Sequence, residues 1–535
     1  MGLHGNWDGR ISRRALLRTG GSAAAGLVML SRSAATARAV PPFTGDPFGL
    51  GVASGDPTAN GIVLWTRLAP APLEGGGLPP EVFGVRYELA TDEGFRRIVR
   101  RGTVEALPDE VHTVHAEIGG LQPATQYWYR FKWGTAVSRV GRTRTAPAAD
   151  AIPAPEAPMR FAYVSCQNWS NGFYPAYADL AEQDVDVVVH LGDYIYEGAG
   201  LAANRVRDHL PARELFSLSD YRTRHAQYRT DLQLQAAHAA HPFLMTWDDH
   251  EFKDNYADLD LEPDVPLETA AARRAAAYLA YWEHAPLSRK RKPVGKDMPL
   301  YRRARWGALA TFHVLDTRQH RSDQFTQCAR PAQDPSGYCP DALLDTRGIL
   351  GATQREWLFE GLVGSGTSWN IIANQVAFAP HDRQDGPARL FIVDKWDGYV
   401  HDRQLVLNFL AARGLKNTVV ITGDAHINSV RNVPPNFRSF DGEPVATEFM
   451  GTSISSDGDQ PLDTRYVDPE NPHILFHNNQ RGYAKVTLEP ARWTNEFRVV
   501  PTVRRTDVAA TTLATFLVEN GKPGASQLKP VVSPV

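Results

Sequence analysis

Long apolar segments are absent from this chain of 535 residues. The small-residue stretch over 19–31 is too short and too closely flanked by arginine to cross a membrane, and no other segment is apolar over the length of a span. The sequence therefore excludes a transmembrane helix, and we expect the mature protein to be soluble. Internal repeats and long low-complexity tracts are also absent, which argues against a repeat architecture.

An excess of positive charge is absent as well. The formal net charge is −3, and the first 39 residues hold six arginines and one aspartate, so the remaining chain carries about −8. This balance does not indicate binding to nucleic acid or to an anionic membrane surface. The chain after residue 39 is long enough for more than one domain and an ample core.

The first 39 residues are typical of an export signal. The run SRRALLR (12–18) resembles a twin-arginine motif, a small-residue apolar stretch follows it, and ARA (37–39) offers a cleavage site. The alternative is a chance arginine pair in a disordered tail. We predict a twin-arginine signal peptide over 1–39. The protein would then be secreted or extracellular, periplasmic or associated with the cell wall, and the twin-arginine translocase would be its export partner.

Cysteine is scarce, with three residues in the whole chain. Cys328 and Cys339 lie close together in a Pro/Gly-rich segment, and outside the cytoplasm we expect them to form a disulfide. Cys166 is then left over at the end of an apolar run. A lone cysteine is usually a small buried hydrophobic residue, but it can also be a metal ligand or a reactive thiol. The cysteine count leaves both readings open.

Residues 46–148 differ in pattern from the rest of the chain. Short alternating runs separated by turn residues are typical of a small antiparallel β-sandwich. The run LQPATQYWYRFKW resembles a strand of a fibronectin type III domain, with Tyr127 placed like its tyrosine-corner residue. A Pro/Ala-rich linker over 145–158 predicts a boundary near residue 150. We expect an N-terminal β-sandwich domain over 46–148, a second domain over 159–505 and a C-terminal extension over 506–535.

After residue 158, apolar runs of strand length alternate with helical stretches, which favours an α/β fold. The sequence predicts helices over 219–239, 267–284, 353–363 and 399–413. Thr353 and Glu356 form the pattern of a capping box at the start of the third of these helices.

Five of the strand-like runs end in a residue that can bind a metal ion. Sites in α/β sheets lie beyond the carboxyl ends of the strands, so adjacent strand ends would bring these side chains together. The candidates are Cys166, Asp193 with Tyr196, the cluster of Asp248, Asp249 and His250, Asn374, and Asp424 with His426. Each also has a purely structural reading: a turn, a packing residue, a helix cap or a buried hydrogen-bonding amide.

These motifs resemble the calcineurin-like metallophosphatase superfamily, which includes the purple acid phosphatases. Its pattern is an acid at the first strand end, then GDxxY, GNH(D/E), a later ligand and GHxH. Here GDYIY (192–196), DDHE (248–251) and GDAH (423–426) take these places, with Asp249 at the Asn position and Asp424 at the first His position. Cys166 stands where the first acid is expected.

The departures together resemble one branch, the alkaline phosphatase D (PhoD-type) family. SCQNW, GDYIYE, WDDHEFKDN, LDTRQHR, ANQV, WDGY and GDAHI all fit it, as do the leader and the β-sandwich. The resemblance covers nearly the whole chain. It implies an α/β fold: a calcineurin-like metallophosphatase sandwich of mixed sheets flanked by helices, preceded by a small fibronectin type III-like β-sandwich domain.

The resemblance also implies an iron–calcium site. Fe3+ would be held by Cys166, Asp193, Tyr196 and His426. Ca2+ would be held by Asp193 as a bridging ligand together with Asp249, Asn374 and Asp424. This agrees with ligand chemistry, because thiolate, tyrosinate and imidazole suit iron whereas oxygen ligands suit calcium. The partition between the two ions stays open, and Asp248 could be the ligand in place of Asp249.

The implied activity is that of a secreted metal-dependent phosphoesterase, an alkaline phosphatase with phosphodiesterase activity. Metal-bound hydroxide would attack the phosphorus of a phosphate-ester substrate. His250 matches the superfamily histidine that stabilises the transition state or donates a proton. The alternatives are a phospholipase D or another phosphodiesterase and, more distantly, a non-enzymatic calcium-binding surface protein. Arg205, Arg207 and Arg213 could receive a monoester dianion or form a solvated face. We expect a monomer.

Overall fold

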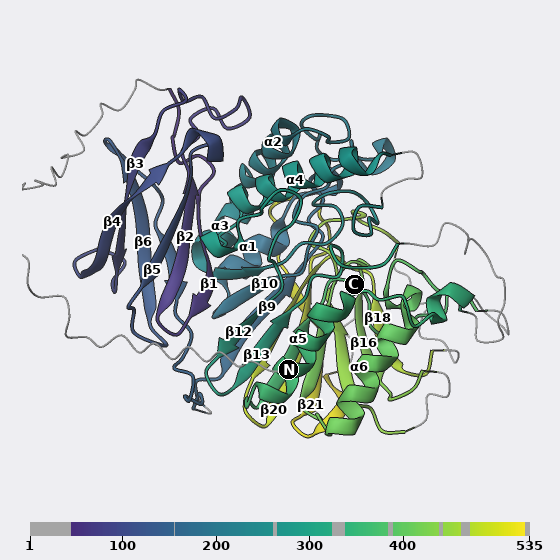
Figure 1. The fold of residues 1–535 in the computed structure, drawn as a ribbon. Coiled ribbons are helices and arrows are strands. Elements are labelled where there is room, and N and C mark those ends of the chain that lie inside the picture. Colours follow the sequence, from purple (N-terminus) through teal and green to yellow (C-terminus); the bar gives the residue numbers. More distant parts are fainter. Residues whose placement is uncertain are drawn as a thin grey trace, which may run out of the picture. The chain divides into compact units, whose positions relative to one another are not determined.

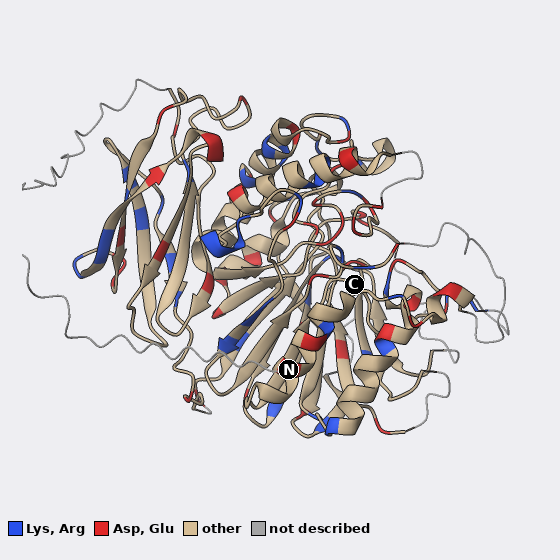
Figure 2. Cartoon of the chain, viewed as in Figure 1, with Lys and Arg blue, Asp and Glu red and all other residues tan. Residues whose placement is uncertain are grey.

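The computed structural model describes residues 44–529, except for 155, 261–264, 324–337, 384–388, 438–441 and 462–470. The predicted leader over 1–39 and Cys328 fall outside these residues, so the export signal and the disulfide stay predictions. Among the helices of the described residues, none is long and apolar enough to cross a membrane. Basic and acidic residues are interspersed over the elements seen in Figure 2.

The first strands of the chain build two packed layers (Figure 1). One layer holds β1 (Val52–Thr58), β2 (Gly61–Arg67) and β5 (Thr113–Gly119). The other holds β3 (Phe83–Ala90), β4 (Ile98–Ala106), β6 (Gln126–Trp133), β7 (Ala136–Val137) and β8 (Gly141–Arg144). Alternate apolar side chains of both layers enclose a common core. Tyr127 is buried there, and its hydroxyl accepts a hydrogen bond from the backbone N–H of Gln122 at 3.0 Å, which ties β6 to the segment before it.

The layer of β1, β2 and β5 does not end at the predicted boundary near residue 150. Strand β1 pairs in parallel with β11 (Pro242–Met245), and the result is one ten-stranded sheet in the order β22-β21-β20-β19-β9-β10-β11-β1-β2-β5. Gly55 permits this junction, because a Cβ at that position would lie 2.3 Å from the carbonyl oxygen of Pro286. The remaining strands of this sheet are β9 (Met159–Val164), β10 (Val187–His190), β19 (Gly482–Leu488), β20 (Arg492–Val499), β21 (Thr511–Glu519) and β22 (Lys522–Lys529).

The region expected as a C-terminal extension contributes β21 and β22 to this sheet. Leu513, Phe516 and Val518 of β21 are buried in the same core as β9 and β20. In the structure these two strands form a hairpin that pairs with β20 and covers the edge of the sheet.

A second, seven-stranded sheet packs face to face against the first. Its order is β12-β13-β14-β15-β17-β16-β18. The strands are β12 (Arg302–Trp306), β13 (Ala310–Val314), β14 (Trp369–Ala373), β15 (Thr418–Thr422), β16 (Asn428–Val433), β17 (Ala446–Met450) and β18 (Ile474–Asn478). Val187 and Val189 of β10 face this sheet, whereas Val188 faces the helices on the other side. A strand buried on both faces explains why its sequence is apolar without alternation.

Helices cover the outer face of each sheet (Figure 1). The ten-stranded sheet carries α1 (Pro175–Glu182), α2 (Leu218–Arg229), α3 (Leu232–Ala240) and α4 (Leu267–His284). The seven-stranded sheet carries α5 (Gly351–Gly364) and α6 (Val400–Arg413). The expectation of mixed sheets flanked by helices and preceded by a β-rich region is confirmed.

Two local helix predictions were wrong. The stretch over 219–239 is not one helix, because α2 ends at Arg229 and Asp231 caps α3 by accepting hydrogen bonds from the N–H groups of Gln233 and Leu234. The capping box at Thr353 is not used, since α5 begins two residues earlier. The backbone N–H groups of Ile349 and Leu350, just before α5, donate instead to the carboxylate of Asp402 in α6.

The pairing of β1 with β11 generates a prediction about domain independence. A chain that begins at residue 149 should be recovered mainly as insoluble protein, because removing β1 leaves the edge of β11 unpaired. The matched chain that begins at residue 40 should stay soluble and unfold cooperatively in urea. Soluble, active protein from the shorter chain would instead show that the N-terminal strands form a separable domain.

Candidate metal centre

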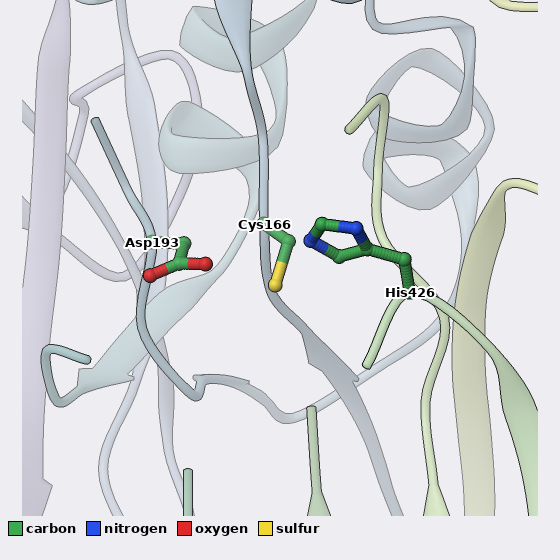
Figure 3. Close-up of side chains that lie close together, drawn as sticks. All are labelled: Cys166, Asp193 and His426. Carbon is green, nitrogen blue, oxygen red and sulfur yellow. The ribbon is translucent and has the colours of Figure 1, made fainter. Parts of the chain in front are cut away.

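The ends of five strands converge where the two sheets meet. Strands β9, β10 and β11 run parallel to one another, so the residues that follow them share one edge of the ten-stranded sheet. Strands β14 and β15 are likewise parallel and end at the facing edge of the second sheet. Cys166 and Asp193 come from the first sheet and His426 from the second (Figure 3). One potential ligand atom from each of these three side chains lies within 4.8 Å of the other two.

Tyr196 joins this first cluster. Its hydroxyl donates to Oδ2 of Asp193 at 3.1 Å and lies 3.3 Å from Nε2 of His426. The hydroxyl of Ser456 donates to it at 2.6 Å. The four side chains that the family resemblance connects with iron are therefore neighbours in the structure.

A second cluster shares Asp193 with the first. Ligand atoms of Asp193, Asp249 and His250 lie within 4.8 Å of one another. Asp248 belongs to neither cluster; its Oδ1 accepts a hydrogen bond from Nε of Arg318 at 2.5 Å, and Nη2 of the same guanidinium lies 3.5 Å from Oδ1 of Asp249. The geometry thus favours Asp249 over Asp248 as a ligand.

Asn374 and Asp424 lie at adjacent strand ends but have protein partners of their own. The amide of Asn374 accepts from the indole of Trp396 at 3.3 Å and donates to the carbonyl of Val376. Oδ2 of Asp424 forms an ion pair with Lys395. Asp424 is outside both clusters, although it is near enough to act on the pKa of Cys166.

The backbone at the strand ends is held in an unusual conformation. Cys166, Asp193, Asp424 and His426 have φ angles of 58°, 56°, 62° and 57°, in the left-handed region that residues with a Cβ seldom occupy. Such conformations cost on the order of 1–3 kcal/mol each and cluster at functional sites. Here each one turns the chain sharply after its strand and points the side chain to the meeting edge of the sheets.

Glu251 holds two of these turns together. Its buried carboxylate accepts hydrogen bonds from the backbone N–H groups of Asp193, Tyr194 and Asp248 at 3.0, 2.5 and 2.9 Å. The sequence motif contains Glu251 but assigns it no role, and its neighbours in the chain do not reveal its partners. Glu251 is a positioning residue that links the end of β10 to the end of β11.

Buried carboxylates dominate the electrostatics. Burial and the nearby carboxylate of Asp249 raise the pKa of Asp193 well above its ordinary value. Burial and Asp193 likewise raise the pKa values of the Cys166 thiol and the Tyr196 phenol. Burial opposes ionisation of Asp249 too, but the guanidinium of Arg318 and the imidazole of His250 outweigh it and lower the pKa of Asp249. Arg318 is itself fully buried and also pairs with Asp394.

Three carboxylate oxygens at the site are buried without a hydrogen-bond partner in the described structure: Oδ1 of Asp193, Oδ2 of Asp248 and Oδ1 of Asp249. Buried acceptors of this kind are normally satisfied, and leaving them unpaired is costly. A cation near Asp193 and Asp249 would satisfy the unpaired oxygens of these two residues and lower the pKa values of the thiol and phenol beside it. The donor set therefore fits bound metal ions.

Both histidines are oriented by acids that the sequence pattern does not identify. Nδ1 of His250 lies 2.7 Å from Glu197, and Nδ1 of His426 lies 2.7 Å from Asp457. Burial lowers the pKa of His250, but Glu197 outweighs it and the pKa is raised well above its ordinary value. The hydrogen bond from His426 lowers the pKa of Asp457 to about 2. Because an acid is bonded to Nδ1 of each imidazole, the other ring nitrogen, Nε2, is available to the metal centre.

The three arginines of the loop after Tyr196 are engaged elsewhere. Arg205 pairs with Asp208, Arg207 with Asp231 and Arg213 with Asp220, at 3.0, 2.7 and 2.7 Å. Local acids neutralise all three, which argues against a binding site for a monoester dianion; Arg205 and Arg213 lie on a solvated face, whereas Arg207 is largely buried against Trp169.

A two-sheet sandwich that gathers a thiol, a phenol, imidazoles and carboxylates at facing strand ends defines a phosphoesterase of the metallophosphatase class. A purple acid phosphatase from yellow lupin seeds has the same fold, with a TM-score of 0.50 at 12% identity over 88% of this chain and 73% of that one. The PhoD-like phosphatase model matches residues 161–497, and the model of the PhoD-like phosphatase N-terminal domain matches residues 33–147. The chain belongs to the PhoD-like phosphatase family.

Two relatives support this assignment over most of the chain. Alkaline phosphatase D of Bacillus subtilis (strain 168) is 44% identical over 494 residues, which are 91% of this chain and 83% of the relative. A solved structure of PhoD is 43% identical, covers 92% of this chain and 94% of that one, and has a TM-score of 0.87. The protein is therefore a phosphatase that hydrolyses phosphate esters, and the relationship implies a metal cofactor.

The different positions of the two adjacent aspartates generate a prediction. Asp249→Asn should lower the bound divalent metal and reduce kcat/KM at least tenfold, because Asp249 shares a cluster with Asp193 and His250. Asp248→Asn should keep its metal and lose stability, on the order of 1–3 kcal/mol, because it weakens a buried bond to Arg318. Metal analysis and urea unfolding of both variants check this. Loss of metal from Asp248→Asn alone would reverse the assignment.

Proposed function

We propose that this phosphatase is an iron- and calcium-dependent alkaline phosphomonoesterase with secondary phosphodiesterase activity. The observation that carries the proposal is the cluster of Cys166, Asp193 and His426, with ligand atoms within 4.8 Å of one another and the phenol of Tyr196 in contact with two of them. A site built for calcium alone would need neither a thiol nor a phenol.

The donor atoms divide into two sets by their chemistry. The sulfur, nitrogen and phenol donors suit ferric iron, whereas carboxylate and amide oxygens suit calcium. Iron would be held by Cys166, Asp193, Tyr196 and His426, and calcium by Asp193, Asp249, Asn374 and Asp424. Asp193 belongs to both clusters, which supports its role as the shared ligand. Lys395 occupies Oδ2 of Asp424 and leaves Oδ1 for an ion.

When bound, the cations would neutralise phosphate oxygens and lower the pKa of a water molecule that attacks phosphorus. The side chains of the chain itself would do the rest. His250, whose Nδ1 is bonded to Glu197, would donate a proton to the oxygen of the leaving alcohol. Lys395, held at the site by Asp424, would add positive charge beside the phosphate oxygens as negative charge builds on them.

Export belongs to the same proposal. It is supported by the twin-arginine motif over 12–18 and the cleavage site over 37–39, and a disulfide between Cys328 and Cys339 would fit an oxidising compartment. N-terminal sequencing of protein from the culture medium, expected to start at Val40, tests the leader. A protein retained intact in the cytoplasm would contradict it.

The mixed donor set predicts separable metals. Cys166→Ser should lose iron and visible absorbance together, because a hydroxyl is a far poorer ligand for ferric iron than a thiolate. Asp193→Asn should lose both metals. A calcium chelator should abolish activity reversibly while the iron remains. Tyr163→Phe is a matched control on the strand before Cys166, and it should keep iron and colour because its hydroxyl bonds Asn495 rather than the site. Activity that survives complete calcium removal would contradict the second site.

Substrate preference is tested by comparing esters with one and two organic groups. We expect kcat/KM for p-nitrophenyl phosphate to exceed the values for bis-p-nitrophenyl phosphate and phosphatidylcholine, with calcium present at alkaline pH. His250→Asn should slow phosphatidylcholine hydrolysis more than hydrolysis of the two p-nitrophenyl esters, since an alkoxide leaving group needs a proton whereas p-nitrophenolate leaves without one. A clear preference for phosphatidylcholine would make the protein a phospholipase D with the same metal ligands.

A further inference from the structure

Arg481 is a buried arginine in the short connection between the two sheets. It lies after β18 of the seven-stranded sheet and directly before β19 of the ten-stranded sheet. In the described part of the chain its guanidinium donates to neutral oxygens: Oγ of Ser453 and the carbonyl of Ser456, both at 2.7 Å, and the carbonyl of Asn479. Buried arginines are usually paired with an acid, so these bonds indicate a role other than ion pairing.

Two of these bonds hold the segment 453–457, SISSD, which follows β17 and which we call the serine loop. The hydroxyl of Ser453 itself donates to the carbonyl of Ser456 at 3.0 Å, which closes the loop on the guanidinium. The backbone N–H of Gly482 donates to the carbonyl of Ser453 at 3.0 Å. Arg481 and its neighbour therefore fasten both ends of the turn to the connection between the sheets.

The serine loop contacts three of the four side chains that we propose as iron ligands. The backbone N–H of Ser456 donates to the carbonyl of Cys166 at 3.2 Å. The hydroxyl of Ser456 lies 2.6 Å from the phenol oxygen of Tyr196, and the carboxylate of Asp457 lies 2.7 Å from Nδ1 of His426. The position of this one loop thus affects the thiol, the phenol and the imidazole together.

The other anchors of the serine loop belong to the segment that carries Cys166. The N–H of Ile454 donates to the carbonyl of Ser165 at 3.0 Å, and the hydroxyl of Ser455 donates to the carbonyl of Asn168 at 2.9 Å. These bonds join the loop to the turn after β9. Arg481 holds it from the opposite side, so that the loop lies between the two sheets with a fixed partner on each.

The guanidinium also brings positive charge close to the sulfur and phenol donors. Burial lowers the pKa of Arg481, whereas the nearby groups of Asp457, Cys166 and Tyr196 raise it. Cysteine binds metal ions as the thiolate, and a tyrosine ligand binds as the phenolate. A buried cation beside them offsets part of the negative charge that such a donor set carries.

We propose that Arg481 is a positioning residue of the iron site. It holds the serine loop in the arrangement that presents Cys166, Tyr196 and His426 to a single ion. The inference rests on the proposed function for the identity of that ion, but none of the contacts that support it involves the substrate. Removing partners of this kind typically weakens metal binding about 10–100-fold, because the ligands lose their orientation.

Metal affinity and colour test the proposal directly. Arg481→Met should bind iron about tenfold more weakly or worse. Its visible absorbance band should move to longer wavelength, because loss of the positive charge makes thiolate and phenolate better electron donors. Arg481→Lys keeps the charge without the planar set of donors and should restore part of both properties. Arg498→Met is the matched control, because Arg498 in β20 pairs with Asp179 in α1 at 2.8 Å, and it should equal the wild type.

Ser456→Ala keeps the test decisive if Arg481→Met folds poorly. This change leaves the bonds from Arg481 to Ser453 and to the carbonyl of residue 456 in place but removes the hydroxyl beside Tyr196. It should weaken iron binding and move the band in the same direction. Wild-type affinity and band position in Arg481→Lys and Ser456→Ala would overturn the proposal.

Metal analysis of the wild type separates this inference from the proposed function. A wild type that holds another metal in place of iron would contradict the proposed function alone. The affinity comparison is then made with the metal found, and Arg481→Met should again bind it about tenfold more weakly than Arg498→Met. Equal affinities of these two variants would overturn the positioning role whichever metal is present.

Discussion

Buried negative charge at the meeting edge of the two sheets is the constraint on which the rest of the structure depends. Asp193, Asp248, Asp249 and Glu251 are nearly inaccessible to water, and an isolated carboxylate in such a place is strongly unfavourable. The protein itself offsets part of this charge: three backbone N–H groups donate to Glu251, and the guanidinium of Arg318 pairs with both Asp248 and Asp249. Oxygens of Asp193 and Asp249 remain for cations, so stability and metal binding depend on the same groups.

This compensation also determines the local backbone. Left-handed turns at Cys166, Asp193, Asp424 and His426 direct side chains of different strands to one point, and turns of this kind persist only when their surroundings hold them. Glu251 and Ser456 supply that support. Glu251 accepts from N–H groups after β10 and β11, and the hydroxyl of Ser456 lies 2.6 Å from both the carbonyl oxygen of Cys166 and the phenol oxygen of Tyr196. The candidate metal centre is thus held by polar groups from both sheets.

Much of the fold and of the site could be predicted from sequence, because the signals are local. Apolar runs of strand length identified β9, β10, β11, β14 and β15, and motif residues directly after them identified the side chains that the structure brings together. The groups that could not be predicted are long-range partners. Glu197 for His250, Asp457 for His426 and Lys395 for Asp424 lie tens of residues from the side chains they orient, and an acid or a lysine in a loop carries no mark of its partner.

The sequence by itself determined the class of architecture, the candidate ligands and the family, since hydrophobic periodicity and short motifs are encoded residue by residue. Only the tertiary structure decided how the parts connect. It joined β1 to β11, made the segment after residue 506 an edge of the main sheet, divided the helix over 219–239 after Arg229, and placed Asp249 but not Asp248 in a cluster with Asp193. These outcomes depend on which surfaces and charges meet after folding, and that information is distributed over the whole chain rather than present in any single stretch of it.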